Sequence, residues 1–173
     1  MILTVKEVWD IWGAITSFNE DTLNPKFAYA LIKNQHKIKP FMQDLNEKRK
    51  YSPELAEEVK KHEEVRLAIC EKYAKKNDDG QFVTEDNQYV FDDDVKDRFE
   101  SEIKAFMESD DNKKLKELQE DWQKQQNEYL AEEVYIDLYK IDIVYAPEMK
   151  IKTMKLLIDK IITNKEDNPT QVH

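Results

Sequence analysis

Residues 24–45, NPKFAYALIKNQHKIKPFMQDL, carry the clearest structural pattern in this chain of 173 residues. Asn24 followed by Pro25 is typical of a helix start, because asparagine caps the first turn and proline lacks only an amide that has no partner there. Apolar side chains then recur every four and three residues, which is the seam of a coiled coil with one polar member: Phe27, Leu31, Asn34, Ile38, Phe41 and Leu45. Such a seam packs within one chain or against a second copy, so homo-oligomerisation stays open.

Two residues interrupt this seam. A polar residue inside a seam more often fixes the register of packed helices than contacts a ligand, so we expect a structural role for Asn34. Pro40 removes one backbone hydrogen bond, so we expect the helix to kink there or to restart.

The segment before this helix predicts another. Thr4 and Glu7 have the spacing of a capping box, and an apolar stripe from Val5 to Ile15 follows at helical spacing. The first helix should therefore begin at residue 5 and end near Phe18.

The middle of the chain predicts a hairpin of helices. Ser52 and Pro53 begin one helix, which ends near Lys76, and Gly80 suits a left-handed turn. Residues 81–84 and 88–91 have the composition of a small β-hairpin. The acidic residues 92–94 then begin a helix that would reach residue 133, about 60 Å if unbroken, although residues 109–112 are typical of a break or kink.

The C-terminal part predicts a strand and a short helix. Val134, Ile136 and Leu138 alternate with polar or aromatic residues, and the alternation changes parity near Lys140. Thr153 is the expected cap of a last amphipathic helix that runs to Ile162.

Together these patterns predict a mainly α (α+β) fold. We expect a single helical domain over residues 1–163, with a long antiparallel helical-hairpin or coiled-coil arm at about 53–133, a small β-hairpin and a C-terminal strand–helix element. Residues 164–173 should form a flexible polar tail.

The composition excludes several classes of function. The chain has 27 basic and 37 acidic side chains, a net charge of −10, and this charge is concentrated in residues 77–111, which hold 13 acids and 3 bases. The acidic charge argues against a protein that binds nucleic acid or anionic membranes. With only 2 glycines it can form neither a P-loop nor a dinucleotide-binding loop. No signal peptide or membrane-spanning segment is recognisable, so we expect a soluble, intracellular protein.

Candidate chemical groups each have a simpler explanation. Asn77, Asp79 and Gly80 resemble part of a calcium loop, but Lys75 stands where its first carboxylate belongs. His62 lies four residues from Glu58 without a second histidine, which is typical of a core-edge residue. The single cysteine, Cys70, lies on an apolar face and should be a buried thiol. We therefore expect no catalytic residue, no metal site and no cofactor.

The acidic segment is the candidate site for a partner. It could form a negative surface that competes with nucleic acid for a basic groove, or it could be a solvated turn and helix start, where acids are favourable without any partner. The ordinary explanation is favoured for its first acids, and the candidate partner-binding residues are Asp92, Asp93, Asp94, Asp97, Glu100, Glu102 and Glu108.

The order of these features resembles a family of small tailed-bacteriophage proteins grouped under a domain of unknown function. The similarity extends to about residue 162, and the stretches that carry it are residues 3–9, 27–34, 71–74, 78–80, 86–89 and 132–141. The resemblance implies a phage gene product, located in the cytoplasm of the infected bacterium or in the virion, and it supplies no catalytic residues.

The long amphipathic helices and the lack of catalytic motifs predict a non-catalytic protein-binding factor. We expect it to be directed at a host or host-defence protein, as an inhibitor or anti-defence factor. The alternative is a virion assembly or structural component.

Overall fold

The structure is a computed structural model that describes residues 1–19 and 22–164. Its contacts divide the chain into two compact units: unit 1 comprises residues 1–50 and 126–173, and unit 2 comprises residues 51–125. The prediction of a single domain over 1–163 stays a prediction. All but the first residue of the predicted tail 164–173 lies outside the described residues.

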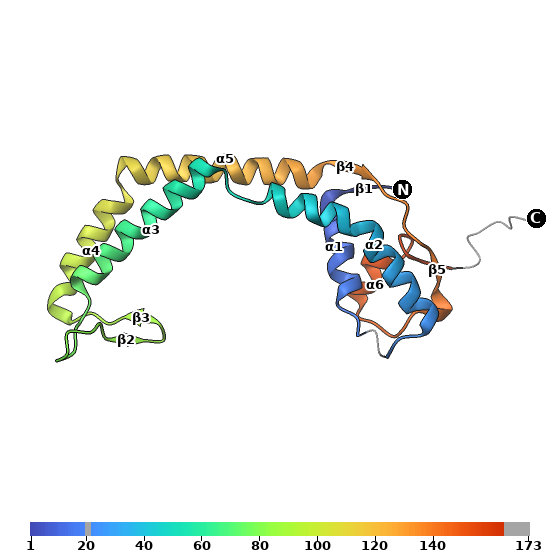
Figure 1. Cartoon of the computed structure of the whole chain (residues 1–173), viewed down its shortest axis with the longest axis horizontal. Helices are drawn as coiled ribbons and strands as arrows, with labels where there is room; N and C mark the ends of the chain where they lie inside the picture. Colours follow the sequence, from blue (N-terminus) through green and yellow to red (C-terminus); the bar gives the residue numbers. More distant parts are fainter. Residues whose placement is uncertain (20–21, 165–173) are drawn as a thin grey trace, which may run out of the picture. The chain divides into compact units, whose positions relative to one another are not determined.

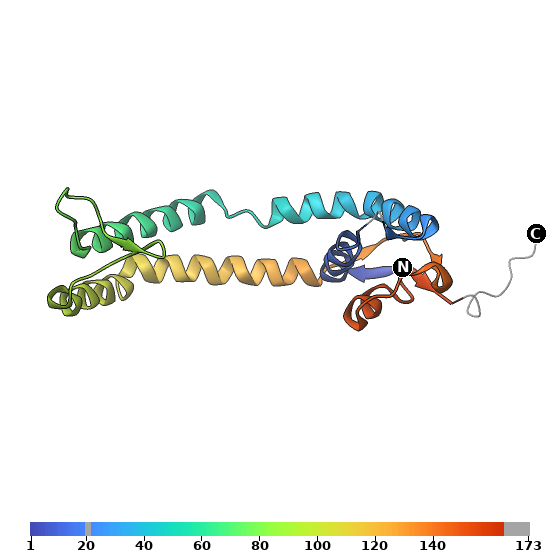
Figure 2. The same ribbon diagram turned by 90° about the horizontal axis from the view of Figure 1, so that it is seen from below.

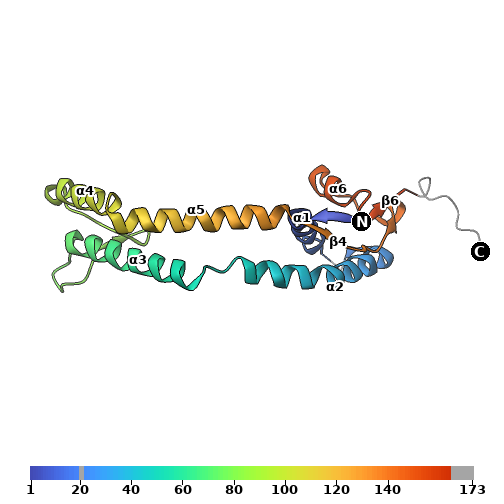
Figure 3. The same cartoon turned by 90° about the horizontal axis from the view of Figure 1, so that it is seen from above.

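The described residues are mainly helical, with three small strand pairs, so the predicted α+β fold class is confirmed. Most of these elements are labelled in Figure 1, and β6 is labelled in Figure 3. The helices are α1 (Val5–Thr16), α2 (Pro25–Lys48), α3 (Pro53–Tyr73), α4 (Asp93–Met107), α5 (Asp110–Ala131) and α6 (Ile151–Leu157), with a 3₁₀ turn at Ile143–Tyr145. The strands are β1 (Ile2–Thr4), β2 (Thr84–Glu85), β3 (Gln88–Tyr89), β4 (Glu133–Tyr135), β5 (Ile141–Asp142) and β6 (Ile162–Thr163).

The first residues of unit 1 form the predicted capping box. Thr4 Oγ1 accepts a hydrogen bond from the Glu7 amide at 3.1 Å, and Glu7 Oε2 accepts one from the Thr4 amide at 2.9 Å. Glu7 also binds Lys160 Nζ at 2.8 Å. The hydrogen bonds from Lys160 and Thr4 hold the pKa of Glu7 below its usual range.

Unit 1 contains the main hydrophobic core. Helix α1 packs against α2 and α6, and β1 pairs antiparallel with β4, with Leu3 opposite Val134 (Figure 3). The core is made of aliphatic side chains and one aromatic: Leu3, Val5, Val8, Ile11, Ala14, Ile15, Phe27, Ala30, Leu31, Ile38, Met42, Leu45, Ile136, Leu138, Ile141, Leu157, Ile161 and Ile162. The α2 seam therefore lies in the core of its own chain and gives no reason to expect homo-oligomerisation.

Helix α2 begins as predicted, with the Asn24 side chain accepting from the Lys26 amide at 2.9 Å. It continues through Pro40 without a restart, so that alternative is wrong. Asn34 has the predicted structural role. It is completely buried, and its side chain donates to the Tyr139 carbonyl at 3.0 Å and accepts from the Tyr139 amide at 2.7 Å.

The C-terminal helix differs from its prediction. Helix α6 begins at Ile151, so Thr153 lies inside it and is not its cap, and it ends at Leu157. The chain turns at Asp159, whose φ is 62°, and Ile162 then pairs parallel with Ile141. Residues 161 and 162 fit the helical spacing, but strand pairing buries the same side chains and satisfies backbone groups as well.

Unit 2 is a hairpin of helices. Helices α3 and α4 lie side by side (Figures 1 and 2) and are joined by the β2–β3 hairpin. Gly80 has a φ of 79°, as its place in the turn predicted. Asp86 and Asn87, with φ values of 49° and 63°, form a tight turn between the hairpin strands. The strands are shorter than predicted at their outer ends, where Phe82 pairs with Lys76 of the segment after α3.

The predicted long helix is interrupted between α4 and α5. Helix α4 ends at Met107 and α5 begins at Asp110, so an unbroken helix over 94–133 is wrong and the break near residue 109 is confirmed. Ser109 caps α5, because its Oγ accepts from the Asn112 amide at 3.3 Å and its carbonyl accepts from the Lys113 amide at 3.1 Å.

Unit 2 has a thin core. All of its residues are described, and those that are fully buried are Leu55, Ile69, Cys70, Ala74, Asn112 and Leu115. Its elements are α3, α4, the β2–β3 hairpin and the first part of α5, and so few elements cover only part of one another's apolar residues.

Candidate functional site

The candidate acidic residues lie on α4 and directly before and after it. Asp92 is the residue before the helix, and its carboxylate accepts no hydrogen bond from the helix amides. It binds Lys75 Nζ at 2.7 Å instead. This ion pair ties the start of α4 to the residues that follow α3.

Two more of these acids are paired within unit 2. Asp93 binds Lys96 at 2.6 Å, and Glu102 accepts from Lys72 Nζ and from the Tyr73 hydroxyl, both at 2.6 Å. These hydrogen bonds lower the pKa of Asp93 and of Glu102. Glu102 therefore helps to hold α4 on α3.

The other candidate acids lie on the surface of α4 and, for Glu108, directly after its last residue. Asp94, Asp97, Glu100 and Glu108 are exposed. Unit 2 as a whole has 13 basic and 22 acidic side chains, so it carries −9 of the net charge of −10. The structure thus separates Asp92 and Glu102, which bind residues at or after the end of α3, from Asp93, which pairs within α4, and from four acids that face solvent.

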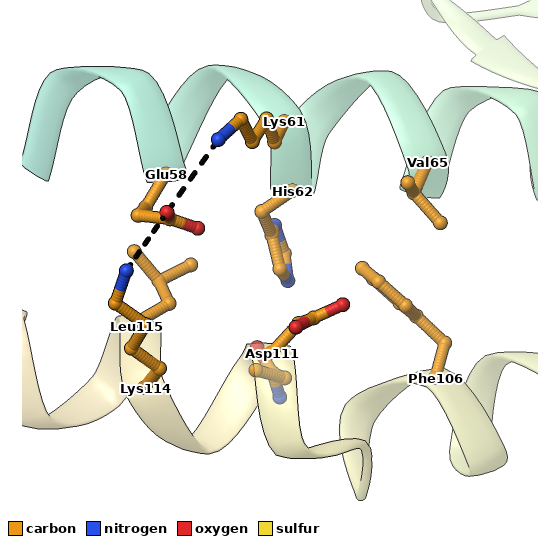
Figure 4. Close-up of a pocket in the computed structure, with 9 residues that line it drawn as sticks. Glu58, Lys61, His62, Val65, Phe106, Asp111, Lys114 and Leu115 are labelled. Carbon is orange, nitrogen blue, oxygen red and sulfur yellow. Dashed lines mark hydrogen bonds and ion pairs between the residues drawn. The ribbon is translucent and has the colours of Figure 1, made fainter. Parts of the chain in front are cut away.

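A cavity of about 280 Å³, here called the His62 cavity, lies between α3 and the α4–α5 junction (Figure 4). The spacing of Glu58, His62 and Val65 places them on one side of α3, and the break after α4 brings residues of both following helices opposite them. The complete lining is Glu58, Lys61, His62, Val65, Phe106, Asp111, Asn112, Lys114 and Leu115.

The acidic group Glu58 of the His62 cavity is paired with two lysines of the same cavity. Glu58 Oε1 lies 3.1 Å from Lys114 Nζ and 3.6 Å from Lys61 Nζ, and the hydrogen bond from Lys114 lowers the pKa of Glu58. The His62 ring packs against the Phe106 ring, tilted by 36°, with 4.8 Å between the centroids. The predicted role of His62 as a core-edge residue is confirmed, although Figure 4 also shows Asp111 pointing into the cavity from the facing helix.

A second cavity of about 410 Å³, here called the Cys70 cavity, lies further along α3. Its lining combines apolar and polar side chains: Arg66, Leu67, Cys70, Asn87, Gln88, Tyr89, Phe91 and Phe99. Phe91 stacks on Phe99 at 4.4 Å between centroids. Cys70 is a buried free thiol, as its apolar flanks predicted.

Neither cavity was predicted. The one available signal was the inner stripe of α3, which carries the polar residues His62 and Arg66 where a well-packed helix has apolar ones. Across residues 1–19 and 22–164 no group of three or more His, Cys, Asp or Glu side chains is arranged to hold a metal ion. Over the same ranges no helix combines the length and hydrophobicity that crossing a bilayer requires.

Comparison of the chain with protein-family models, with curated proteins and with solved structures finds no match. The resemblance to a phage family therefore remains a prediction.

Proposed function

We propose that this chain is a phage-encoded, non-catalytic factor that binds a host or host-defence protein through unit 2. The observation that carries the proposal is the incomplete burial of α4. Its apolar residues Val95, Phe99, Ile103 and Phe106 follow helical spacing, yet none of the helix's fifteen residues, all of them described, is fully buried. An amphipathic helix of this kind has apolar area left for a partner.

The neighbouring helix also offers apolar contacts. Val65 at the His62 cavity is 45% exposed and Leu67 at the Cys70 cavity is 40% exposed. Both cavities are hollows into which side chains of a partner can insert, and inserted side chains in desolvated pockets supply most of the binding energy of protein interfaces.

The size and charge of unit 2 favour a protein partner. Helix α3 has 21 residues, so the α3–α4 pair offers a face of about 30 by 20 Å. This approaches the roughly 800 Å² that each partner contributes to a typical stable complex. The net charge of −9 repels nucleic acid and favours a partner with a basic surface.

Affinity purification of the tagged full chain from infected cells tests this function. The wild type should enrich a host or defence protein, whereas a Val65→Asp/Leu67→Asp variant should lose it, because a carboxylate in each hollow would have to be desolvated. Ile151→Asp, at an exposed apolar position of unit 1, is the matched control and should retain the partner.

The recovered proteins distinguish the alternatives, provided that all three chains have the same circular dichroism spectrum. Recovery of phage head or tail proteins alone would overturn the host-directed function and support a virion component. If the wild type and the double variant recover equal amounts of the host protein, the His62 and Cys70 cavities are not the binding surface.

A further inference from the structure

A second surface, in unit 1, has the opposite charge. Residues 25–43 of α2 contain four lysines and no acid, in a chain with 37 acidic side chains. Lys26, Lys33 and Lys39 are exposed, and Lys37 is half-buried. Unit 1 has nearly balanced charge, with 14 basic and 15 acidic side chains, so this helix is a local concentration of positive charge.

Three tyrosines accompany these lysines. The rings of Tyr29 and Tyr139 make an edge-to-face contact with 5.7 Å between centroids, and Lys33 Nζ lies 5.4 Å from the Tyr29 centroid. Lys26 Nζ donates to the Tyr145 hydroxyl at 2.9 Å and lies 4.3 Å from the centroid of that ring. Each ammonium group is thus held beside an aromatic ring, where the ring quadrupole stabilises it.

The same residues enclose a hollow of about 520 Å³, lined by Pro25, Lys26, Tyr29, Tyr139, Ile141 and Tyr145. Tyr29 is 50% exposed and Tyr139 is 40% exposed, so their rings are accessible from solvent. Tyrosines of this kind provide large contact area with little loss of conformational entropy, which makes them frequent anchors of protein interfaces.

The surface is held in place before any ligand arrives. The buried Asn34 side chain makes two hydrogen bonds to the backbone of Tyr139, and Lys37 binds the Asp137 carboxylate at 3.0 Å. These contacts join the segment after β4 to α2. Such preorganisation reduces the entropy that binding must overcome.

The nearby acids do not line the hollow. Asp137 is paired with Lys37, and Asp142 Oδ1 accepts from the Val144 amide at 3.0 Å. Lys26 and Lys33 are the two lysines nearest the tyrosines. Within residues 1–19 and 22–164, neither of them forms an ion pair with a carboxylate.

We propose that Lys26, Tyr29, Lys33, Tyr139 and Tyr145, here called the tyrosine–lysine surface, bind an acidic peptide segment of a protein partner. Carboxylates of the segment pair with Lys26 and Lys33, and one of its apolar side chains enters the hollow between the tyrosines. Nucleic acid fits less well, because its binders carry a strongly basic face and unit 1 has a net charge of −1. This surface shares no residue with the His62 and Cys70 cavities of unit 2. The acidic-peptide proposal and the proposed function can therefore fail independently of each other.

Selection from a random 12-residue peptide library displayed on beads tests the proposal. The bait is the full chain, and peptides that also bind a Lys26→Glu/Lys33→Glu variant are removed. The selected peptides should be rich in Asp and Glu and contain one aromatic or large aliphatic residue. A selected set without excess acidic residues would overturn the proposal.

Fluorescence anisotropy with a selected peptide provides the quantitative readout. Lys26→Glu/Lys33→Glu should weaken binding at least tenfold, since two attractions become repulsions, and Tyr29→Ala should weaken it severalfold. Lys152→Glu/Lys155→Glu makes the same charge change at exposed positions of α6 and should leave binding unchanged. Equal loss in that control, or tighter binding of a twelve-nucleotide oligothymidine than of the peptide, would contradict the proposal.

Discussion

Replacement of Asn34 by leucine should destabilise unit 1, although leucine is apolar and the position is completely buried. The Asn34 side chain satisfies both the amide and the carbonyl of Tyr139, at 2.7 and 3.0 Å. Asn34→Leu keeps the branched shape and removes both hydrogen bonds. The two backbone groups of Tyr139 would then lack their partner.

The expected loss follows from these two groups. An unsatisfied buried backbone group costs about 1–3 kcal/mol, and Tyr139 lies near the surface, so we expect the lower part of the range for each group and about 2–3 kcal/mol in total. For a chain of this size that corresponds to a fall in Tm of about 4–12 °C.

Urea denaturation followed by tryptophan fluorescence measures the change. A Trp122→Phe background restricts the signal to Trp9 and Trp12, which both lie in unit 1. Asn46→Leu, at an exposed position of the same helix, is the control and should change stability by less than about 0.5 kcal/mol. If Asn34→Leu has an equally small effect, the two hydrogen bonds do not stabilise the fold and the reasoning is refuted.

Three further predictions concern backbone, pH and charge. Gly13→Ala, in α1 with open space around it, should stabilise the protein by about 0.5–1 kcal/mol, because alanine favours the helix. Gly80→Ala, at a φ of 79°, should destabilise it by about 1 kcal/mol. Thermal melts in which both variants shift Tm in the same direction would contradict this. Because the folded-state pKa of Glu7 is lowered, its contribution is present above its ordinary pKa of 4.5 and is lost as the pH falls through the folded value; Tm should therefore fall more steeply between about pH 5 and pH 3 in the wild type than in Glu7→Gln, and parallel Tm curves would argue against this role. Asp97→Asn/Glu100→Gln should weaken capture of the unit 2 partner without lowering Tm, because both acids are exposed and lie beyond the first turn of α4, and unchanged capture would remove these acids from the binding surface.

The local features of the fold could be predicted from sequence because their determinants are close together in the chain. The Thr4 capping box, the Asn24 start of α2 and the Gly80 turn each depend on residues within a few positions. The same is true of the break near Ser109, where the polar run was visible in the sequence.

Features that depend on distant partners could not be predicted. Asn34 was expected to have a structural role, but its partner lies 105 residues away. The C-terminal helix was extended too far because the helical spacing of Ile161 and Ile162 also fits a turn that returns the chain to β5.

The candidate site shows the same limit. The acidic segment was visible in the sequence, but its ion pairs were not. Asp92 binds Lys75 of the segment after α3, and Glu102 binds Lys72 of α3. The two hollows of unit 2 depend on how α3 packs on α4 and on where α5 begins, and neither is encoded by a local motif. The tyrosine–lysine surface combines α2 with residues more than 100 positions later.

Hydrogen exchange of the purified complex tests the central claim most directly. The full chain, bound to the protein that it captures from infected cells, is compared with the free chain. The account predicts that backbone amides of α3 and α4 exchange fast in the free chain, because α4 has no buried side chain, and become protected in the complex, whereas the core helix α1 changes little. Protection confined to unit 1, or the absence of any captured host protein, would contradict it.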